Sequence, residues 1–158
     1  MHGFGPYSPV RVVDTLIAAK KHFGFTSNKL EWTSKYLTDE PKSKHKQFPG
    51  FELWEQCLAD NPLAWKEMEK YNVQDVVATE KLYLRLRPWI SSHPNLGVYN
   101  GLDHACPKCG STKVQKRGES VSQASRYQRY QCSDCGGWSR AKSLLTPLKT
   151  RKGILCPV

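Results

Sequence analysis

Acidic residues are nearly absent from the last third of this 158-residue chain. From Ala105 to Val158 there are 2 acidic residues against 11 Lys and Arg, whereas Met1 to His104 holds 12 against 13. Almost all of the net charge of +10 therefore lies in the last third. A local positive excess predicts a polyanionic partner, most of all nucleic acid, with a solvated basic tail as the alternative.

Long apolar runs are absent as well. No stretch approaches the roughly 20 apolar residues that a membrane-spanning helix needs. The N-terminal sequence MHGFGPYSPV lacks the basic and apolar regions of a secretory signal peptide. We therefore expect a soluble, cytoplasmic protein with no membrane partner. The length allows one ordinary domain, or one small domain with an appendage.

The hydrophobic pattern of the first hundred residues predicts one short strand and several helices. The sequence PVRVVD, Pro9 to Asp14, predicts a buried strand, and Asp14 predicts the N-cap of the helix that follows. A later helical pattern starts at Pro62 and ends before Pro88, as one kinked helix or as two helices divided at Asn72. A lone strand has nothing to pair with, so this region looks like the later part of an α/β domain.

Two polar segments predict irregular structure. Residues 38–50 hold prolines and lysines and predict a loop that could touch a phosphate backbone or simply be solvated. Residues 93–103 are rich in turn formers and predict a linker. Of the solitary cysteines, Cys57 lies on the apolar side of a short helical pattern and is predicted to be buried, and Cys156 is predicted to be a free thiol in a tail.

Two C-x-x-C pairs form the most specific motif in the chain. They are Cys106 with Cys109 and Cys132 with Cys135. Each pair can present two thiolates from a tight turn, and four thiolates satisfy tetrahedral Zn²⁺ and close its site to water. In an intracellular chain such pairs favour a metal. We predict structural zinc, with a disulfide pair or an iron–sulfur site as the alternatives.

The predicted zinc ribbon has few stabilising interactions other than its metal site. A domain of about 35 residues is too small to build a sufficient core, so zinc would supply its stability. The segments KVQKRG and RYQRYQ predict two strands between the cysteine pairs. Gly110 and Gly136 directly follow the second cysteine of each pair and predict backbone positions with positive φ.

The ribbon interleaves positive charge with aromatic rings. Guanidinium groups contact phosphates, and aromatic rings stack on unpaired bases. The predicted nucleic-acid-binding residues are Lys113, Lys116, Arg117, Arg126, Tyr127, Arg129, Tyr130, Trp138 and Arg140. The alternative for Tyr130 or Trp138 is that one of them fills the small core of the ribbon.

A tyrosine and an aspartate lie four residues apart in the long helical pattern. This spacing puts Tyr71 and Asp75 on one helix face, one turn apart. An aspartate beside a phenol is a plausible pair for binding a metal ion and positioning a water molecule. One carboxylate cannot hold two catalytic cations, so the pair predicts further ligands elsewhere.

These motifs resemble those of a known family. The segments VVDTLIAAKKHFGFTSNKL, GFELWEQCLADNPLAWKEMEKYNVQDVVATEKLYLRLRPWI and HPNLGVY are similar to the second half of the DnaQ-like 3′–5′ exonucleases of the ribonuclease H-like superfamily. The YprB-type subgroup, common in bacteriophages, is the most similar and can carry a C-terminal zinc ribbon. The resemblance covers about residues 7–140 and places the protein in a bacterium or a phage-infected host cell.

The resemblance implies two-metal phosphodiester hydrolysis by four acidic residues in three motifs. Two divalent cations, Mg²⁺ or Mn²⁺, lie about 4 Å apart in such sites. Only the third motif, Tyr-x-x-x-Asp, is present here, as the catalytic residue Tyr71 and the metal ligand Asp75. No Asp-x-Glu occurs anywhere in the chain. Asp14 matches a helix cap rather than one of the four acids.

We therefore expect an α/β fold in two parts. Residues 1–92 would be the mostly helical C-terminal portion of a ribonuclease H-like domain, and residues 93–103 the linker. A small β zinc ribbon would occupy residues 104–142, followed by a basic tail over residues 143–158. The expected cofactors are structural zinc, and Mg²⁺ or Mn²⁺ only where the catalytic site is completed.

Three functions fit these observations. The first is the C-terminal portion of an exonuclease, inactive alone and completed by a separate chain that carries the missing N-terminal half. The second is a non-catalytic protein that binds nucleic acid, DNA favoured over RNA, through its zinc ribbon. The third is an interaction protein that binds a related nuclease through its exposed half-domain.

Overall fold

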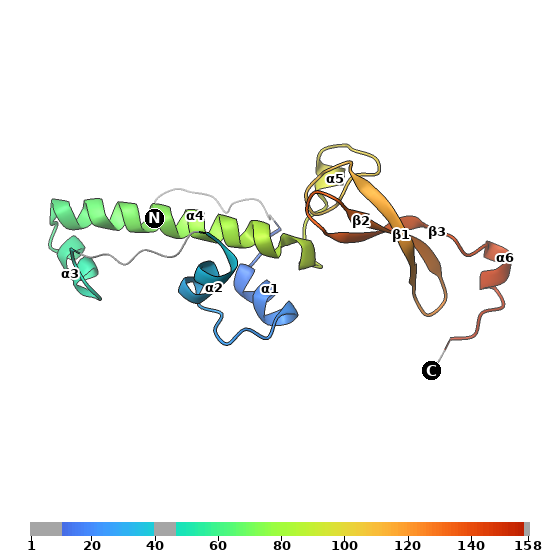
Figure 1. The fold of residues 1–158 in the computed structure, drawn as a ribbon, viewed down its shortest axis with the longest axis horizontal. Helices are drawn as coiled ribbons and strands as arrows, with labels where there is room; N and C mark the ends of the chain where they lie inside the picture. Colours follow the sequence, from blue (N-terminus) through green and yellow to red (C-terminus); the bar gives the residue numbers. More distant parts are fainter. Residues whose placement is uncertain (1–10, 40–46, 157–158) are drawn as a thin grey trace, which may run out of the picture. The chain divides into compact units, whose positions relative to one another are not determined.

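The computed structural model describes residues 11–39 and 47–156. The chain divides into two compact units, a helical unit over residues 14–86 and a ribbon unit that contains residues 87 onward together with residues 11–13 of the described chain. Helices make up the first unit, and a three-stranded antiparallel sheet is the centre of the second (Figure 1). The mixed α/β composition agrees with the prediction, and the ribonuclease H-like assignment stays a prediction.

The helical unit contains four helices. They are α1 (Thr15–His22), α2 (Leu30–Leu37), α3 (Glu52–Leu58) and α4 (Pro62–Leu86). The helix α4 is continuous over 25 residues, so the pattern is one helix and Asn72 lies inside it. Asn61 caps it by accepting a hydrogen bond from the Leu63 N–H at 3.0 Å. After α4 the backbone tightens into a 3₁₀ turn, η1 (Arg87–Trp89), which contains Pro88.

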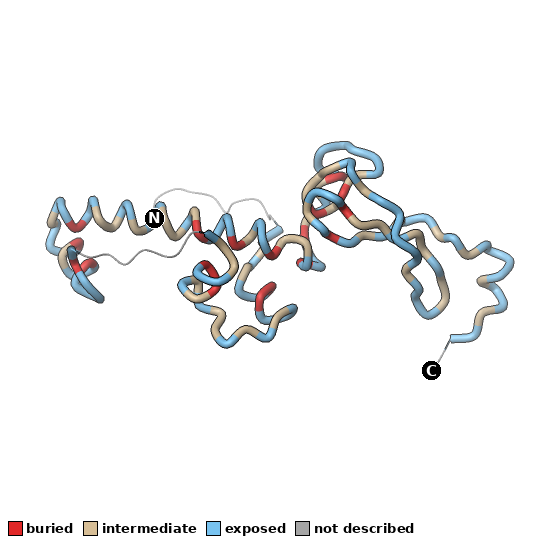
Figure 2. Tube along the Cα trace, in the orientation of Figure 1, coloured by how far each residue is buried: buried red, intermediate tan, exposed pale blue. Residues whose placement is uncertain are grey.

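The core of the helical unit is in two pieces along α4. Near the start of α4, Leu53 and Cys57 of α3 pack with Ala64, and Cys57 is buried as predicted. Near its end, Leu82 and Leu86 pack with residues of α1 and α2. Figure 2 shows the buried residues grouped where these short helices meet α4. The long helix is therefore the common support of two separate hydrophobic clusters.

The predicted strand before α1 is wrong for the residues that the structure describes. Residues 11–14 form no strand, and Val12 is 76 % exposed. Pro9 and Val10 lie outside the described residues. The physical reason is the lack of a partner, because a strand needs a neighbouring ladder and the described strands pair only with one another.

Asp14 acts as the predicted N-cap of α1. Its Oδ1 accepts hydrogen bonds from the Leu16 N–H at 2.7 Å and from the Ile17 N–H at 3.1 Å. These amides have no partner inside the helix, which is why a carboxylate at this position stabilises it. The interaction explains the residue without any catalytic role.

The ribbon unit is built on strands β1 (Val114–Val121), β2 (Arg126–Cys132) and β3 (Trp138–Leu144) in the order β1-β2-β3. The first two strands confirm the prediction from the segments between the cysteine pairs. The third follows the second pair and was not predicted, because its sequence WSRAKSL contains no β-branched residue. Gly118, with φ +70°, lies at the irregularity in the β1–β2 register.

The predicted linker over residues 93–103 contains a short helix, α5 (Leu96–Tyr99). Asn95 caps this helix, and the Leu96 N–H donates to the Pro107 carbonyl at 3.0 Å. A side chain at Gly97 would come within 3.3 Å of the Ala105 Cβ. This segment therefore packs on the first cysteine turn as part of the ribbon unit.

The remaining segments are the basic tail and the predicted loop over residues 38–50. The basic tail contains a short helix, α6 (Leu148–Arg151). The predicted loop over residues 38–50 falls mostly on residues 40–46, which lie outside the described residues. Within the described ranges, no helix has the length and apolar character that crossing a membrane requires.

We expect the substitution Asp14→Ala to destabilise the helical unit by about 1 kcal/mol, because two amides at the start of α1 lose their acceptor. Asp14→Asn is the matched control and should keep nearly all of the stability, since asparagine caps as well as aspartate. Urea unfolding followed by far-ultraviolet circular dichroism measures both. Equal losses for the two variants would contradict a capping role.

Candidate metal centre and nucleic-acid interface

The sulfur atoms of the two C-x-x-C pairs come together in the ribbon unit. All four Sγ atoms lie within 4.8 Å of one another. Cys106 Sγ is 3.7 Å from Cys135 Sγ, and Cys109 Sγ is 3.6 Å from Cys132 Sγ. A tetrahedral ion with metal–sulfur bonds of about 2.3 Å separates its ligands by about 3.8 Å. The cluster can therefore hold one metal ion, and it fits the predicted structural zinc.

The first cysteine turn is fixed by its backbone. The Gly110 N–H donates to the Cys106 carbonyl at 2.8 Å, and the Cys106 N–H donates to the Ser111 carbonyl at 2.7 Å. Gly110 has φ +76°, as predicted from its place after the second cysteine. This left-handed conformation turns the chain back while both sulfurs stay on the inside.

The second cysteine turn repeats the same pattern. The Gly136 N–H donates to the Cys132 carbonyl at 3.0 Å, and the Cys132 N–H donates to the Gly137 carbonyl at 3.0 Å. Gly136 has φ +73°, again as predicted. Two equivalent turns thus face each other, and each presents two sulfur atoms to the centre.

Side chains link the two turns. Asp134 accepts hydrogen bonds from the Ser111 hydroxyl at 2.7 Å and from the Lys113 ammonium at 3.2 Å. A Cβ at Gly137 would lie 3.1 Å from Lys108 Cγ, so the stem of this buried lysine crosses over the second turn. These contacts could not be predicted from the sequence, because nothing in the C-x-x-C spacing specifies the side chains around the cysteines.

The environment of two of the four sulfurs, those of Cys109 and Cys135, disfavours their ionisation without a cation. Burial raises the pKa of the Cys109 thiol and raises that of Cys135 to about 12. Burial also acts on Cys132, but hydrogen bonds from the backbone amides of Cys135 and Asp134 outweigh it and lower the pKa of Cys132. A bound cation is what lets four adjacent sulfurs carry negative charge together.

One face of the sheet carries alternating guanidinium groups and aromatic rings. The Arg129 guanidinium carbon lies 4.5 Å from the centre of the Trp138 ring, and that of Arg140 lies 3.8 Å from the centre of the Tyr127 ring. Arg129 and Arg140 are directly paired across β2 and β3, so all four side chains share a face. We call these four residues the arginine–aromatic face. Hydrogen bonding from Arg140 is the main cause that lowers the pKa of Tyr127.

The other predicted nucleic-acid-binding residues divide into two groups. Lys113 and Arg126 form ion pairs, with Asp134 at 3.2 Å and with Glu119 at 2.6 Å. The remaining three lie on β1 and β2. Arg117 donates to Gln115, and Lys116 is paired across the strands with Tyr130.

Tyr130 and Trp138 lie on opposite faces of the sheet. Tyr130 is paired with Ser139, the residue that follows Trp138, and neighbouring residues of a strand point to opposite faces. Tyr130 is half-buried, whereas Trp138 is 46 % exposed. Trp138 therefore does not fill a core, and its ring is accessible on the arginine–aromatic face.

The predicted catalytic pair lies on α4 between the two hydrophobic clusters. Tyr71 and Asp75 are both half-buried, and the Tyr71 ring meets the Trp54 ring edge-on at 6.0 Å. The Thr79 hydroxyl donates to the Asp75 carbonyl at 2.7 Å. Across residues 11–39 and 47–156, the cysteine cluster is the only group of three or more Cys, His, Asp or Glu close enough to hold a metal ion. The described residues therefore bring no second and third ligand to Asp75.

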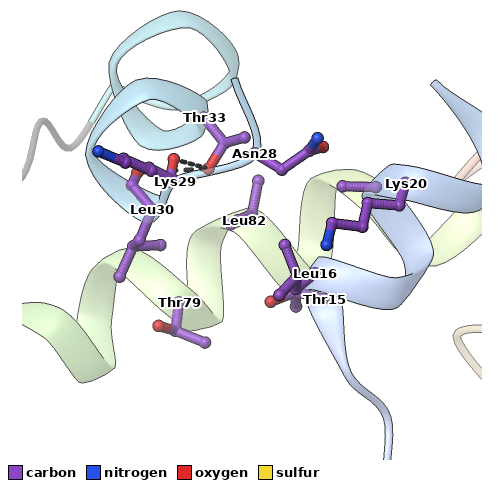
Figure 3. Close-up of a pocket in the computed structure, with 10 residues that line it drawn as sticks. Thr15, Leu16, Lys20, Asn28, Lys29, Leu30, Thr33, Thr79 and Leu82 are labelled. Carbon is purple, nitrogen blue, oxygen red and sulfur yellow. Dashed lines mark hydrogen bonds between the residues drawn. The ribbon is translucent and has the colours of Figure 1, made fainter. Parts of the chain in front are cut away.

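An open pocket of about 550 Å³ lies one turn further along α4. Figure 3 shows Leu16, Leu30 and Leu82 around it, contributed by α1, α2 and α4. Thr79 also lines the pocket, and the Asn28 Oδ1 atom is buried there without a hydrogen-bond partner among the described residues. The pocket is an open depression where α1, α2 and α4 meet.

No protein-family model, curated protein or solved structure matches this chain. The resemblance to DnaQ-like exonucleases therefore rests on the sequence motifs, above all on Tyr71 and Asp75.

We expect the full chain to carry one tightly bound metal ion and the substitution Cys132→Ser to abolish its stoichiometric binding, because one of the four sulfurs is lost. Cys156→Ser is the matched control, since this exposed thiol is outside the cluster. Elemental analysis of the purified variants measures the metal. A Cys132→Ser protein that retains a full equivalent would contradict the proposed ligand set.

Proposed function

We propose that this protein binds single-stranded nucleic acid through the arginine–aromatic face of a zinc-stabilised ribbon. The observation that carries the proposal is the pair of stacked contacts, Arg129 on Trp138 and Arg140 on Tyr127, on one exposed sheet face. Where guanidinium groups and aromatic rings lie side by side, the guanidinium groups can bind a phosphate backbone and the rings can stack on its bases.

The charge balance of the ribbon supports this function. The only acidic residues after His104 are Glu119 and Asp134, and both are in ion pairs. The arginines of the arginine–aromatic face therefore keep their positive charge available to an anionic partner. The partner must supply many negative charges in a row, which is the property of nucleic acid.

An unpaired strand suits the geometry better than a duplex. A base can stack on an aromatic ring only where its face is not covered by its neighbours in a helix. Arg129 covers Trp138 at 4.5 Å, and 46 % of this residue still remains exposed. We favour DNA over RNA as the partner, in the cytoplasm of a bacterial or phage-infected cell.

Zinc would have a structural role in this function. Four cysteine ligands leave no open coordination position for a water molecule or a substrate, so the ion would not catalyse. The second cysteine turn leads directly into β3, which begins with Trp138. The ion would thus hold β3 against β2 and keep both stacked pairs in place.

We expect Trp138→Ala to weaken the binding of a labelled single-stranded oligonucleotide by about 1–3 kcal/mol, because a stacking surface is lost. Arg140→Gln should weaken it too and should reduce the slope of log affinity against log salt by about 0.7, the value of one phosphate contact on a single strand. Fluorescence anisotropy at several salt concentrations measures both quantities with the full chain.

Lys66→Gln is the matched control for Arg140→Gln. It removes one positive charge from an exposed position on α4 of the helical unit, outside both sheet faces. Its effect on affinity should be clearly smaller, and metal content should stay at one equivalent in every variant. Equal effects of the two charge removals would show that binding depends on net charge and not on the arginine–aromatic face.

A second candidate function is the completion of a nuclease domain. We propose that the helical unit supplies Tyr71 and Asp75 to a DnaQ-like exonuclease whose other catalytic residues come from a separate chain. Large apolar side chains of α3 and α4 are exposed, as an incomplete domain would leave them. The most exposed of them are Leu58, Leu63, Trp65, Val73 and Val76, and Phe51 at the N-cap of α3 is exposed as well.

The position of Asp75 agrees with this second function. It lies on the α4 face that also carries Ala64, Ala78 and Leu82, and hence between the two core clusters. A separate chain that completes the site would have to bring its own carboxylates toward Asp75. With Mg²⁺ or Mn²⁺ bound, Asp75 would be one metal ligand and Tyr71 would orient the attacking water.

We expect a mixture of this chain with a chain that carries the missing half to degrade a labelled single strand only when Mg²⁺ or Mn²⁺ is present. Asp75→Ala should abolish the degradation, whereas Glu80→Gln, an exposed acid on the same helix, should leave it intact. Gel electrophoresis of the labelled products measures the rate. Degradation that survives Asp75→Ala would rule out the second function.

A further inference from the structure

A groove of about 770 Å³ runs along β3 on the ribbon unit. Residues 139–144, most of β3, form one side of it, and His104, Ala105 and Pro107 form the other. Tyr130 of β2 also lines it. The volume falls within the range of about 300–1,000 Å³ that encloses small organic ligands.

The chemistry of the groove fits a nucleotide. Ala105, Pro107 and Leu144 give it an apolar lining, and the Tyr130 ring adds an aromatic surface. Lys142 lines the same groove, and no carboxylate is among its lining residues. An apolar slot with a cationic side accommodates a base and its phosphate.

The edge of the sheet adds further binding groups. In the order β1-β2-β3, the outer edge of β3 pairs with no strand of the described residues. Its outward backbone amides can therefore donate hydrogen bonds to phosphate oxygens. A second copy of this chain is disfavoured at the edge, because its own Arg140 and Lys142 would face these positive charges.

The groove is continuous with the arginine–aromatic face through β3. Arg140 lines the groove and also stacks on Tyr127 at 3.8 Å. Tyr130 lies on the groove side of β2, and Arg129 lies on the other side. A single strand that crosses the edge of β3 would meet both surfaces in succession.

We propose that this groove is a second nucleic-acid subsite, which takes one or two unstacked nucleotides of the strand that stacks on the arginine–aromatic face. This inference rests on the proposed binding of single-stranded nucleic acid. It adds that the binding site continues around the edge of β3, so that affinity increases with the length of the strand beyond the first stacked bases.

The test compares oligothymidylates of about 4 and about 12 nucleotides, the range of site sizes for small single-strand binding modules. Ala141→Phe places a ring in the groove and should weaken the affinity for the longer strand about tenfold, the effect of one lost stacked base. The shorter strand should lose less than about twofold. Ala124→Phe is the matched control in the β1–β2 turn, outside the groove, and should change neither affinity.

A second variant tests the groove independently, in case the Ala141→Phe protein does not fold. Lys142→Glu alters only an exposed side chain and should also weaken the longer strand preferentially. With the unaltered protein, photo-crosslinking of a 12-mer oligonucleotide that carries iodouracil should give adducts on Tyr130. Adducts confined to Tyr127 and Trp138 would overturn the inference.

The remaining outcomes separate this inference from the proposed function. If Trp138→Ala weakens both strands while Ala141→Phe and Lys142→Glu weaken neither, the groove is not a subsite and the proposed function stands. If none of the three changes any affinity, both fail. If Ala141→Phe weakens the affinity of the protein for an oligoglutamate peptide but not for either oligonucleotide, the groove binds an acidic peptide and the inference is wrong.

Discussion

The attraction that four adjacent sulfur atoms can exert on one cation is the interaction on which we propose that the ribbon unit depends. Between residues 111 and 144 only Cys132 and Gly137 are buried, so the three strands enclose almost no apolar side chains. Backbone ladders alone do not hold so small a sheet together in water. With a metal ion bound to the four cysteines, the arrangement of Arg129, Trp138, Arg140 and Tyr127 would depend on an ion that contacts none of them.

The helical unit meets a different constraint. Its short helices are too small to be stable alone, and each gains stability by packing on α4. The helix α3 packs on the first turns of α4, and α1 and α2 pack on its last turns. Tyr71 and Asp75 lie between these two contact regions and are both half-buried, with the Tyr71 ring against Trp54 of α3.

The sequence predicted well those features that local chemistry determines. The cysteine spacing, the positive φ of Gly110 and Gly136 and the cap at Asp14 each follow from residues close together in the chain. The strand before α1 was wrong because β-branched residues favour a strand only where another strand can pair with them. The stacking of Arg129 on Trp138 could not be predicted, because it depends on the register between two strands and one of these was not recognised.

The two cysteine turns, with their matching hydrogen bonds, also bear on the order of folding events. Each turn closes through contacts four or five residues apart, which form quickly and at a small cost in chain entropy. The contact between Cys109 and Cys132 spans 23 residues, so it forms more slowly and at a larger cost in chain entropy. An ion bound first by either turn can then bind the other, and in this way the metal can nucleate assembly of the hairpin. Speed of maturation would then follow the local supply of the ion as well as the sequence of the strands.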